Sequence, residues 1–501
     1  MLAQALSASI LGVEGVPVRV EVDIAFGLPA LTIVGLAGSA VQEARERVRS
    51  AIRNSGYEVP ARRITVNLAP ADLPKEGTGY DLAIAVGILA ASGQVRDASL
   101  SATALIAELA LDGSLQPVPG AMALVAAVAE AGIDGAIVAP ANDAEAAAVR
   151  GVSVHSAATL GQAIGHLSGA HPLPPVRATP LPDAGPVRAD ADLADVIGQP
   201  LARRALEIAL AGRHNLALFG PPGVGKTLIL RCAAGLLPAL DDAEAIEVSR
   251  IYSVAGLVDR RRPLTRQRPF RAPHHTISTQ ALVGGGPRVR PGEASLAHRG
   301  VLLLDEALQF RADALDALRQ PMEAGSVSIA RVDGALQLPA RFSLLIAFNP
   351  CPCGWRGSAS GLCRCEDGVA RRYAARLSGP LRDRIELWVE MAEPMRRLSA
   401  PDGSEPSAIV ARRIAAAWER RRQRHVDDPP SARNRLDASA GLSAKLRRGL
   451  EREARGFGLS ARRAQATADV ARTIADLDRS ESVTAQHLHE ALAYRPQERA
   501  A

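Results

Sequence analysis

The stretch Gly220-Pro-Pro-Gly-Val-Gly-Lys-Thr227 decides the fold, because it matches the phosphate-binding pattern G-x-x-x-x-G-K-[ST]. Its residues are Gly220, Pro221, Pro222, Gly223, Val224, Gly225, Lys226 and Thr227. The glycines let consecutive backbone N–H groups face phosphate oxygens, Lys226 reaches the β and γ phosphates, and Thr227 offers its hydroxyl to Mg²⁺. An apolar strand pattern precedes the stretch and a helical pattern follows it, which weighs against a glycine loop formed by chance. The stretch therefore predicts a P-loop that binds ATP.

Length and composition bound the class of protein. A chain of 501 residues, of which 47% are hydrophobic, predicts about three domains with ample cores. No apolar run approaches the length of a membrane span, and no basic region precedes the apolar residues at the N-terminus as it would in a signal peptide. We therefore expect a cytoplasmic protein without a membrane partner.

Charge is distributed unevenly along the chain. Residues 1–170 carry 10 basic and 16 acidic side chains, a net charge of −6, whereas residues 171–395 carry +5 and residues 396–501 carry +7. Lysine occurs only at positions 75, 226 and 445, so the basic residues are almost all arginine, which forms bidentate contacts with phosphate. This predicts a nucleic-acid surface outside the first 170 residues. A genome that favours arginine codons is the alternative explanation.

Hydrophobic patterns and proline content divide the chain into four segments. Residues 1–168 alternate strand and helix patterns and predict an α/β domain, and residues 190–395 predict an α/β core with a parallel sheet around the P-loop. Between them, residues 169–189 are so rich in proline that they predict a semi-rigid linker. Residues 396–501 predict a small helical lid. The fold class is therefore α/β, with two α/β units followed by helices.

Two further apolar strand patterns end in polar residues suited to nucleotide chemistry. One ends in Asp305 and Glu306, the Walker B arrangement, in which Asp305 holds Mg²⁺ together with Thr227 and Glu306 orients the attacking water. The other ends in Asn349, placed as a sensor of the γ phosphate or of the attacking water. Asparagine at a strand end is also a common turn former, which is the alternative. Together these residues predict ATP hydrolysis.

The segment Ser378–Ile385 contains arginines that could complete the site of a neighbouring chain. An arginine supplied by a second subunit stabilises the charge that develops on the transferred phosphoryl group. We expect Arg384, rather than Arg382, to act in this way. The alternative is a surface arginine paired with Asp383.

Four of the five cysteines form two C-x-C pairs separated by nine residues, namely Cys351, Cys353, Cys363 and Cys365. Four thiolates at this spacing could meet at one tetrahedral Zn²⁺. Four reduced thiols in a loop are the alternative. Either arrangement indicates a reducing compartment and argues against a disulfide framework.

These motifs together resemble an AAA+ ATPase, and more closely the ComM/YifB family of magnesium-chelatase-like proteins. The resemblance extends over essentially the whole chain. The segments that carry it most specifically are Arg268–Thr276, Leu282–Gly286, Arg290–His298, Asn349–Gly354 and Ser378–Arg384. Two departures from the family pattern, Ala-Leu-Gln-Phe at residues 307–310 and arginine at residue 382, concern no nucleotide ligand.

The resemblance implies further site residues. It places an insertion between the two Walker motifs that projects toward the pore of a ring. The arginines of this stretch are candidates for sequence-independent contacts with DNA phosphates, namely Arg260, Arg261, Arg262, Arg266 and Arg268. A solvated loop is the alternative. The resemblance also implies that Arg462, at the start of a lid helix, reaches the nucleotide of its own subunit and couples hydrolysis to domain movement.

The N-terminal segment resembles the Lon-protease-like α/β fold through Pro74–Ile84 and Leu111–Gly120. Proteolytic members need a serine in the first segment and a lysine shortly after the second. Here Gly79 stands at the first position and Ala121-Met122 at the second. Because a nucleophile needs a nearby base, we expect no peptidase activity.

By resemblance, we expect a hexameric, ATP-driven motor that acts on single-stranded or branched DNA. Its expected activity is branch migration or unwinding in natural transformation and recombination, with competence or recombination proteins as further partners. ATP and Mg²⁺ are the expected cofactors, and Zn²⁺ is the expected structural ion. The alternatives are a remodelling motor of magnesium-chelatase type that acts on a protein, and a DNA-binding scaffold that retains ATP without moving.

Overall fold

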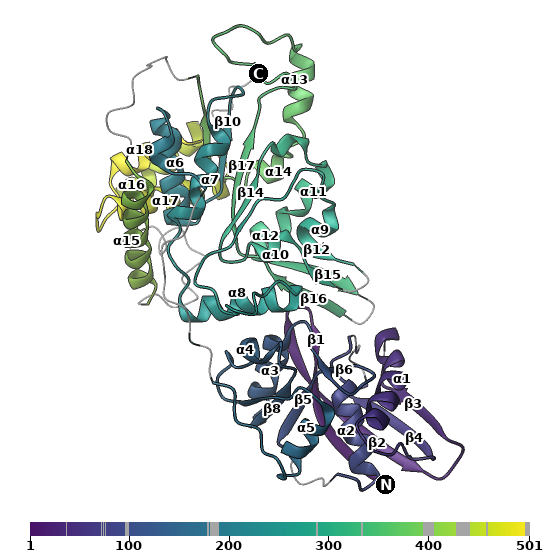
Figure 1. Cartoon of the computed structure of the whole chain (residues 1–501). Helices are drawn as coiled ribbons and strands as arrows, with labels where there is room; N and C mark the ends of the chain where they lie inside the picture. The colour runs from purple at the N-terminus through teal and green to yellow at the C-terminus, as the bar shows by residue number, and fades with distance from the viewer. Residues whose placement is uncertain are drawn as a thin grey trace.

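The computed structural model describes residues 1–36, 38–71, 73, 75, 77–95, 100–177, 180, 190–286, 289–331, 334–393, 405–426, 441–456 and 459–495. Most of the segment predicted as a linker, residues 178–179 and 181–189, lies outside these ranges, and so does the predicted boundary between residues 395 and 396. Figure 1 shows three parts, which we call the N-terminal unit (residues 1–167), the P-loop unit (residues 190–393) and the lid (residues 405–495).

The N-terminal unit is built on a mixed seven-stranded sheet. Its strands are β1 Leu2–Leu11, β2 Glu14–Ala25, β3 Ala30–Val34, β4 Arg63–Ala69, β5 Thr103–Ile106, β8 Gly135–Val138 and β9 Ser153–Ser156. They stand in the order β3-β4-β2-β1-β5-β8-β9, in which β1 and β2 form a long antiparallel hairpin. A separate short hairpin pairs β6 Glu108–Leu109 with β7 Leu115–Gln116.

Helices cover both faces of this sheet. They are α1 Ser39–Asn54, α2 Asp81–Ala91, α3 Ala121–Glu130, α4 Asp143–Ala146 and α5 Leu160–Leu167. Helices α1, α2 and α5 share one apolar core with the sheet, and α3 and α4 share another. Strand β8 contributes Ile137 to the first core, and Ala136 and Val138 to the second. Successive side chains of a strand point to opposite faces, so a strand buried on both sides is apolar throughout.

The P-loop unit is built on five strands, β10 Leu216–Phe219, β11 Phe270–Arg271, β14 Val301–Leu304, β17 Ser343–Phe348 and β18 Leu387–Glu390. Their order is β11-β14-β17-β10-β18, and every pairing is parallel. The carboxyl ends of parallel neighbours meet at one edge of a sheet. The segments that follow β10, β14 and β17 therefore lie together.

Helices and hairpins enclose this sheet. Its helices are α6 Pro200–Gly212, α7 Lys226–Leu236, α8 Asp242–Ala255, α9 Thr279–Val283, α10 Glu293–Leu296, α11 Ala312–Ala317, α12 Arg319–Ala324, α13 Asp367–Ala374 and α14 Gly379–Arg382, with short 3-10 turns at Leu193–Asp195 and Ala307–Gln309. The hairpins pair β12 Gly284–Gly285 with β13 Arg290–Pro291, and β15 Ser326–Arg331 with β16 Gly334–Pro339. Along β14, Leu303 faces the core shared with α6 and α7, whereas Leu302 and Leu304 face the opposite core, which contains residues of α8 to α11.

The lid consists of α15 Ser407–Val426, α16 Ala444–Gly456, α17 Ala461–Leu477 and α18 Ala485–Ala493. Its apolar residues join the same core as α6 and α7. Trp418 of α15 donates from Nε1 to the carbonyl oxygen of Leu210 at 2.9 Å, and the guanidinium carbons of Arg213 and Arg268 lie 4.2 and 4.3 Å from its ring centroid. These contacts anchor the lid on the P-loop unit. Among the described residues, every helix is too short or too polar to cross a membrane.

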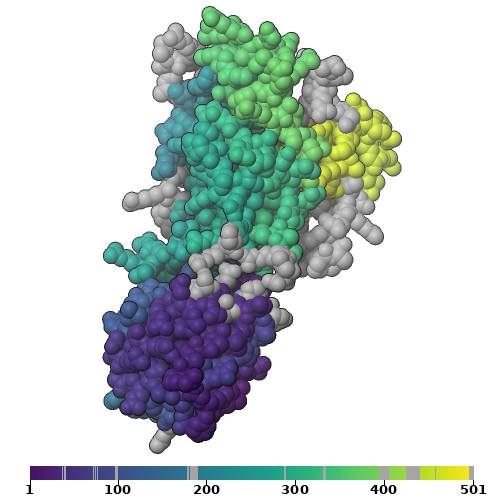
Figure 2. All heavy atoms as spheres, turned by 90° about the vertical axis from the view of Figure 1, so that its right-hand side faces the viewer, coloured from purple at the N-terminus to yellow at the C-terminus, as the bar shows by residue number. Residues whose placement is uncertain are grey.

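The N-terminal unit contacts the P-loop unit where α3 packs against α8. The backbone N–H of Gly120 donates to the carbonyl oxygen of Ser253 at 2.9 Å, and Oγ of Ser253 donates to Glu145 at 2.6 Å. Burial raises the pKa of Glu145. Val13, in the turn between β1 and β2, joins the apolar core beside the β15–β16 hairpin. Figure 2 shows the N-terminal unit in purple directly beneath the P-loop unit.

Candidate active site

The P-loop closely approaches the strand-end segment that follows β18. Gly220 has a φ of +155°, and a Cβ at this position would lie 2.2 Å from the carbonyl oxygen of Met391. Only glycine fits there, which explains the first glycine of the motif. Lys226 is almost buried, and its Nζ donates to the carbonyl oxygens of Gly220 and Pro221 at 2.9 and 2.7 Å. The ammonium group therefore lies inside the loop that is shaped to hold phosphates.

The structure brings the predicted strand-end residues together around this loop. Nζ of Lys226 donates to Oδ1 of Asn349 at 3.0 Å, and Oγ1 of Thr227 donates to Oδ1 of Asp305 at 3.1 Å. Burial lowers the pKa of Lys226, and the charges of Asp305 and Glu306 oppose that effect. A hydroxyl beside a carboxylate, next to a lysine, is the donor set that holds a nucleotide with Mg²⁺. These residues therefore fit the cofactors predicted from the sequence.

Glu306 occupies an unusual backbone conformation at the end of β14. Its φ of 51° lies in the left-handed region, which residues with side chains rarely adopt. Its backbone N–H donates to Oδ1 of Asp305 at 3.0 Å, and its own side chain is exposed. Such strained positions cluster at functional sites. The turn leaves the Glu306 carboxylate in solvent, where an attacking water would be available.

Arg384 lies at the opposite end of β10 from the P-loop. Nδ2 of Asn215, the residue before β10, donates to the carbonyl oxygen of Arg384 at 2.8 Å. The Arg384 side chain is only 10% exposed and pairs with Glu323 of α12 at 2.6 Å. Its neighbour Arg382 lies over the ring of Trp388. The structure therefore places the Arg384 side chain on Glu323 and away from the P-loop of its own chain.

Arg462 differs from its expected position. Its Nη1 donates to the second carboxylate oxygen of Glu323 at 2.8 Å, so it shares that residue with Arg384. The first turn of α17 is held there because Arg463, the next residue, pairs with Asp383. The sequence-based expectation that Arg462 reaches the nucleotide of its own chain is therefore not met. Both arginines gather at the amino end of β10.

The arginine-rich stretch divides into buried and exposed members. Arg268 was expected to contact DNA, but its side chain is only 2% exposed and pairs with Glu244, while Nε donates to the carbonyl oxygen of Pro238 at 2.9 Å. Burial lowers the pKa of Arg268 to about 10. Arg268 therefore stabilises the interior of the P-loop unit, and the prediction that it contacts DNA is wrong. Arg266 is partly exposed and pairs with Asp242 at 2.6 Å.

The remaining candidates of this stretch, Arg260, Arg261 and Arg262, are exposed. The backbone N–H of Arg261 donates to the side chain of Asp259 at 2.9 Å, which tightens the turn. Arg260 lines a cavity of about 200 Å³ between the N-terminal and P-loop units, together with Glu145. These three side chains are exposed, and the charge of Arg260 also acts on the Glu145 carboxylate.

The four clustered cysteines lie on the loop after β17, and we call them the thiol cluster. Their Sγ atoms all lie within 4.8 Å of one another, and they could hold a metal ion. The backbone N–H of Trp355 donates to Cys353 and is the main reason that the pKa of this thiol falls to about 6. The fifth cysteine, Cys232, is buried in α7 as a small core residue.

Comparison with known proteins covers nearly the whole chain. The family described as "Magnesium chelatase, subunit ChlI" matches residues 192–398, "Subunit ChlI of Mg-chelatase" matches residues 20–142, and "Magnesium chelatase, subunit ChlI C-terminal" matches residues 404–495. The chain is 45% identical over 490 residues to the uncharacterized protein YifB of Salmonella typhimurium, covering 97% of this chain and 95% of that protein. It is 42% identical over 504 residues to the competence protein ComM of Haemophilus influenzae, covering 99% and 97%.

The chain belongs to the ComM/YifB family of magnesium-chelatase-like proteins. The uncharacterized protein Rv2897c of Mycobacterium tuberculosis is a further relative, 42% identical over 505 residues, with 99% of this chain and 98% of that protein covered. Membership of the ComM/YifB family confirms the resemblance seen in the motifs and the α/β fold class, and it indicates an AAA+ ATPase.

Two residues near the ComM/YifB-type site were missed from the sequence. Gln199 adopts a left-handed φ of 57°, and its Nε2 donates to the carbonyl oxygen of Val224 in the P-loop at 3.3 Å. The signal that could have indicated Gln199 is its polar side chain directly before the helical pattern that starts at residue 200. Glu323 carried no local signal at all.

The N-terminal unit of this ComM/YifB family member lacks a peptidase dyad at the predicted positions. Gly79 has no side chain to serve as a nucleophile, and a Cβ added there would lie 3.7 Å from Cγ1 of Val118. Ala121 and Met122 are buried at the start of α3, where the backbone N–H of Met122 donates to Oγ of Ser253 in α8. The position that would hold a catalytic base instead forms part of the contact with the P-loop unit.

Proposed function

We propose that this protein is an ATP hydrolase whose active site is completed by a second copy of the chain. The observation that carries the proposal is the separation of the site into two halves. Asp305 and Asn349 gather with the P-loop at the carboxyl end of the sheet, whereas Arg384 and Arg462 gather on Glu323 at the amino end of β10. In a ring of identical chains, one half of each subunit can face the other half of its neighbour.

Each residue then has a role in hydrolysis. When bound, Mg²⁺ neutralises charge on the β and γ phosphates. Thr227 and Asp305 orient that ion, and Lys226 transfers its hydrogen bonds from loop carbonyl oxygens to phosphate oxygens. Glu306 orients the attacking water, and Asn349 holds the water or the γ phosphate. Arg384 of the adjacent chain stabilises the charge that develops in the transition state.

We infer that the ring, a homo-hexamer, moves along single-stranded or branched DNA. Two observations support this. The exposed Arg260, Arg261 and Arg262 offer phosphate contacts that are independent of base sequence. A relative that covers almost the same length carries the name competence protein ComM. The activity would be branch migration or unwinding during natural transformation and recombination, with proteins of those pathways as partners.

A second candidate function is the remodelling of a protein partner. All three matching family descriptions name a subunit of magnesium chelatase, which supports this alternative. A third candidate, a scaffold that binds DNA without moving, would have no use for Glu306 beside an intact P-loop.

The experiment that separates these candidates measures ATP hydrolysis by the full chain with and without single-stranded, duplex and branched DNA. Lys226→Ala is the control, because it removes the ammonium group from the P-loop. The DNA proposal expects hydrolysis that DNA stimulates and that added salt suppresses. Hydrolysis that no DNA changes contradicts it and favours the protein-remodelling candidate. Absence of hydrolysis by the unmodified chain contradicts the ATPase itself.

A further inference from the structure

The thiol cluster has the geometry of a four-coordinate metal site. The Sγ atom of Cys351 lies 3.4 Å from that of Cys353 and 3.8 Å from that of Cys363, and the Cys353–Cys363 distance is 3.7 Å. Four sulfurs placed about 2.3 Å from a central zinc ion stand about 3.8 Å apart at the corners of a tetrahedron. A disulfide would need about 2.05 Å, and all these cysteines are free. The spacing therefore matches ligands that surround one ion.

The loop that carries the cluster has almost no core of its own. Between Cys351, which is buried, and Asp367, where α13 begins, only Gly354 is buried. No helix or strand forms in this described segment. An exposed segment of this length gains little from hydrophobic burial and still loses its conformational entropy on ordering. A shared metal ion supplies the missing cross-link, as in small domains that fold around zinc.

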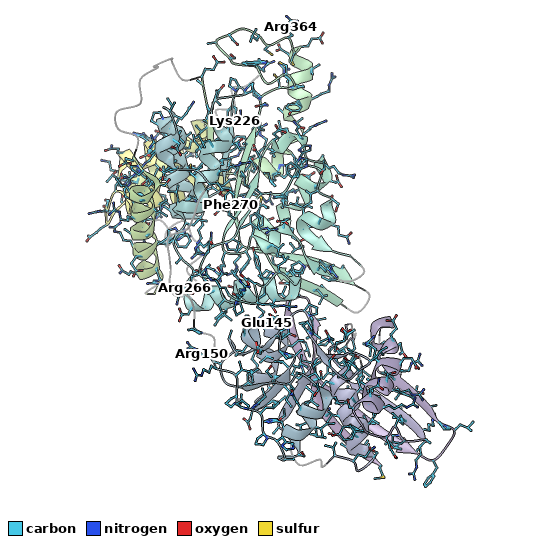
Figure 3. The ribbon with its side chains drawn as sticks, viewed as in Figure 1. Glu145, Arg150, Lys226, Arg266, Phe270 and Arg364 are labelled. Carbon is cyan, nitrogen blue, oxygen red and sulfur yellow. The ribbon has the colours of Figure 1, made fainter. Side chains whose placement is uncertain are left out.

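The cluster is joined directly to the nucleotide site. Cys351 stands two residues after Asn349, the residue that contacts Lys226. The backbone N–H of Gly354 donates to the carbonyl oxygen of Cys351 at 3.0 Å, so a tight turn follows the first cysteine. A Cβ on Gly354 would lie 3.2 Å from Cδ of Pro222 in the P-loop and 3.5 Å from Nδ2 of Asn349. In Figure 3, Arg364 of the same loop lies beyond Lys226, at the same end of the sheet.

We propose that the thiol cluster binds one zinc ion and that this ion positions Asn349 and Pro222 for nucleotide hydrolysis. The binding half stands on the sulfur geometry alone, whereas the positioning half rests on the proposed ATPase function. Zinc holds four thiolates in a closed tetrahedral site without redox chemistry. The ion fixes the position of Cys351. The turn from Cys351 to Gly354 then holds Gly354 against Pro222 of the P-loop. Asn349 and Pro222 are thus positioned by a metal ion that touches neither of them.

The binding half is tested by the metal content of the full chain. We expect about one zinc ion per chain in the unmodified protein and in Cys232→Ala, which removes the thiol outside the cluster. Cys353→Ser combined with Cys365→Ser should contain none. Co²⁺ added to metal-stripped protein should give the absorption bands of tetrahedral thiolate coordination, and the double variant should not. Less than about half an equivalent of zinc, or iron in its place, overturns the assignment.

The positioning half is tested by nucleotide turnover and binding without DNA. Removal of zinc should lower turnover by about 10²-fold, because small displacements of positioning groups have effects of that size, and re-added zinc should restore it. Gly354→Ala keeps all four thiols but introduces a Cβ against Pro222 at a positive φ, so it should retain zinc and lose turnover. If zinc is lost and turnover is unchanged, or if Gly354→Ala hydrolyses ATP normally, the positioning role is overturned.

These outcomes are distinguishable from failure of the proposed function. A chain that binds zinc but hydrolyses no ATP in any form contradicts the ATPase proposal and leaves the metal site standing. A chain that still hydrolyses ATP at the normal rate after zinc is removed contradicts only the positioning role of zinc.

Discussion

Glu323 accepts a hydrogen bond from Arg384 at 2.6 Å, and its other carboxylate oxygen accepts one from Arg462 at 2.8 Å. One carboxylate therefore holds two arginines at the amino end of β10, away from the phosphate loop of the same chain. Neither arginine can stabilise a phosphoryl group on its own P-loop without a large rearrangement. This arrangement is the basis of the proposal that a second chain completes the site.

The first prediction concerns this dependence. Arg384→Ala and Lys226→Ala should each lower ATP turnover by about 10³-fold or more when assayed alone. Equal mixtures of the two, assembled into mixed rings, should recover turnover, because about a quarter of the interfaces then combine an intact P-loop with an intact arginine. Turnover measured against the mixing ratio tests this. If verified mixed rings stay as inactive as the single variants, Arg384 does not act on a neighbour.

The second prediction concerns Glu306, which orients the attacking water. Glu306→Gln should leave ATP affinity nearly unchanged, because its proposed role is to orient the attacking water and not to hold a phosphate, and it should lower turnover by about 10²–10⁴-fold. Asp313→Asn is a matched control, since it neutralises an exposed carboxylate that pairs with Arg311. Equilibrium binding of a labelled nucleotide and the hydrolysis rate are measured side by side. Normal hydrolysis by Glu306→Gln would show that another group orients the water.

The third prediction concerns the exposed arginines. Arg260→Ala with Arg261→Ala and Arg262→Ala should weaken DNA binding equally for unrelated sequences. It should also reduce the slope of log K against log salt by about 0.9 for each DNA phosphate that these arginines neutralise. The control removes the same charge from exposed positions in the N-terminal unit, with Arg19, Arg45 and Arg53 changed to alanine. Unchanged affinity and slope in the first variant would remove this stretch from the DNA-binding surface.

Much of the nucleotide half of the site could be predicted from the sequence. The P-loop motif dictates its own backbone, and each apolar run that ends in a polar residue predicts a buried strand with that residue at its carboxyl end. Parallel pairing then brings Lys226, Thr227, Asp305 and Asn349 together without further information. The contacts needed for this prediction are local or follow from one simple sheet.

Other features depend on long-range packing and could not be predicted from the sequence. Strand β1 was not predicted, because its inward positions include small residues such as Ala5 and Ser7, which give little apolar alternation. The buried role of Arg268 depends on Glu244, which lies 24 residues away, and on Trp418 of the lid. The position of Arg462 depends on Glu323, 139 residues earlier. A run of arginines does not reveal which side chain turns inward.

The fourth prediction concerns pH and the contact between the lid and the P-loop unit. His214 is buried, and its Nε2 donates to Oγ1 of Thr473 in α17 at 2.8 Å, because that hydroxyl uses its own hydrogen toward Asp469. Burial, with Arg421 and Arg495 nearby, lowers the pKa of His214 to about 3. In the unfolded chain the His214 imidazole takes up a proton near pH 6.5, whereas in the folded chain it stays neutral at that pH. The contribution of His214 to stability is therefore present above that pH and is lost as the pH falls.

The expected loss is up to about 1.4 kcal/mol for each pH unit below 6.5. His214→Gln keeps a hydrogen-bonding side chain without a titrating group, so its stability should depend less on pH across this range. His489→Gln is the control, because His489 is exposed. Denaturant unfolding at a series of pH values between 7.5 and 5 measures the difference. Parallel curves for the unmodified chain and His214→Gln would contradict this assignment.

We propose that ATP hydrolysis moves this protein along DNA. The most direct measurement follows the movement of a branch point in a four-way or forked DNA substrate with ATP, using the full chain and Lys226→Ala. We predict that the unmodified chain moves the branch only when ATP is hydrolysed, and that Lys226→Ala does not move it. A branch that stays in place while the unmodified chain hydrolyses ATP in the same tube would contradict the motor.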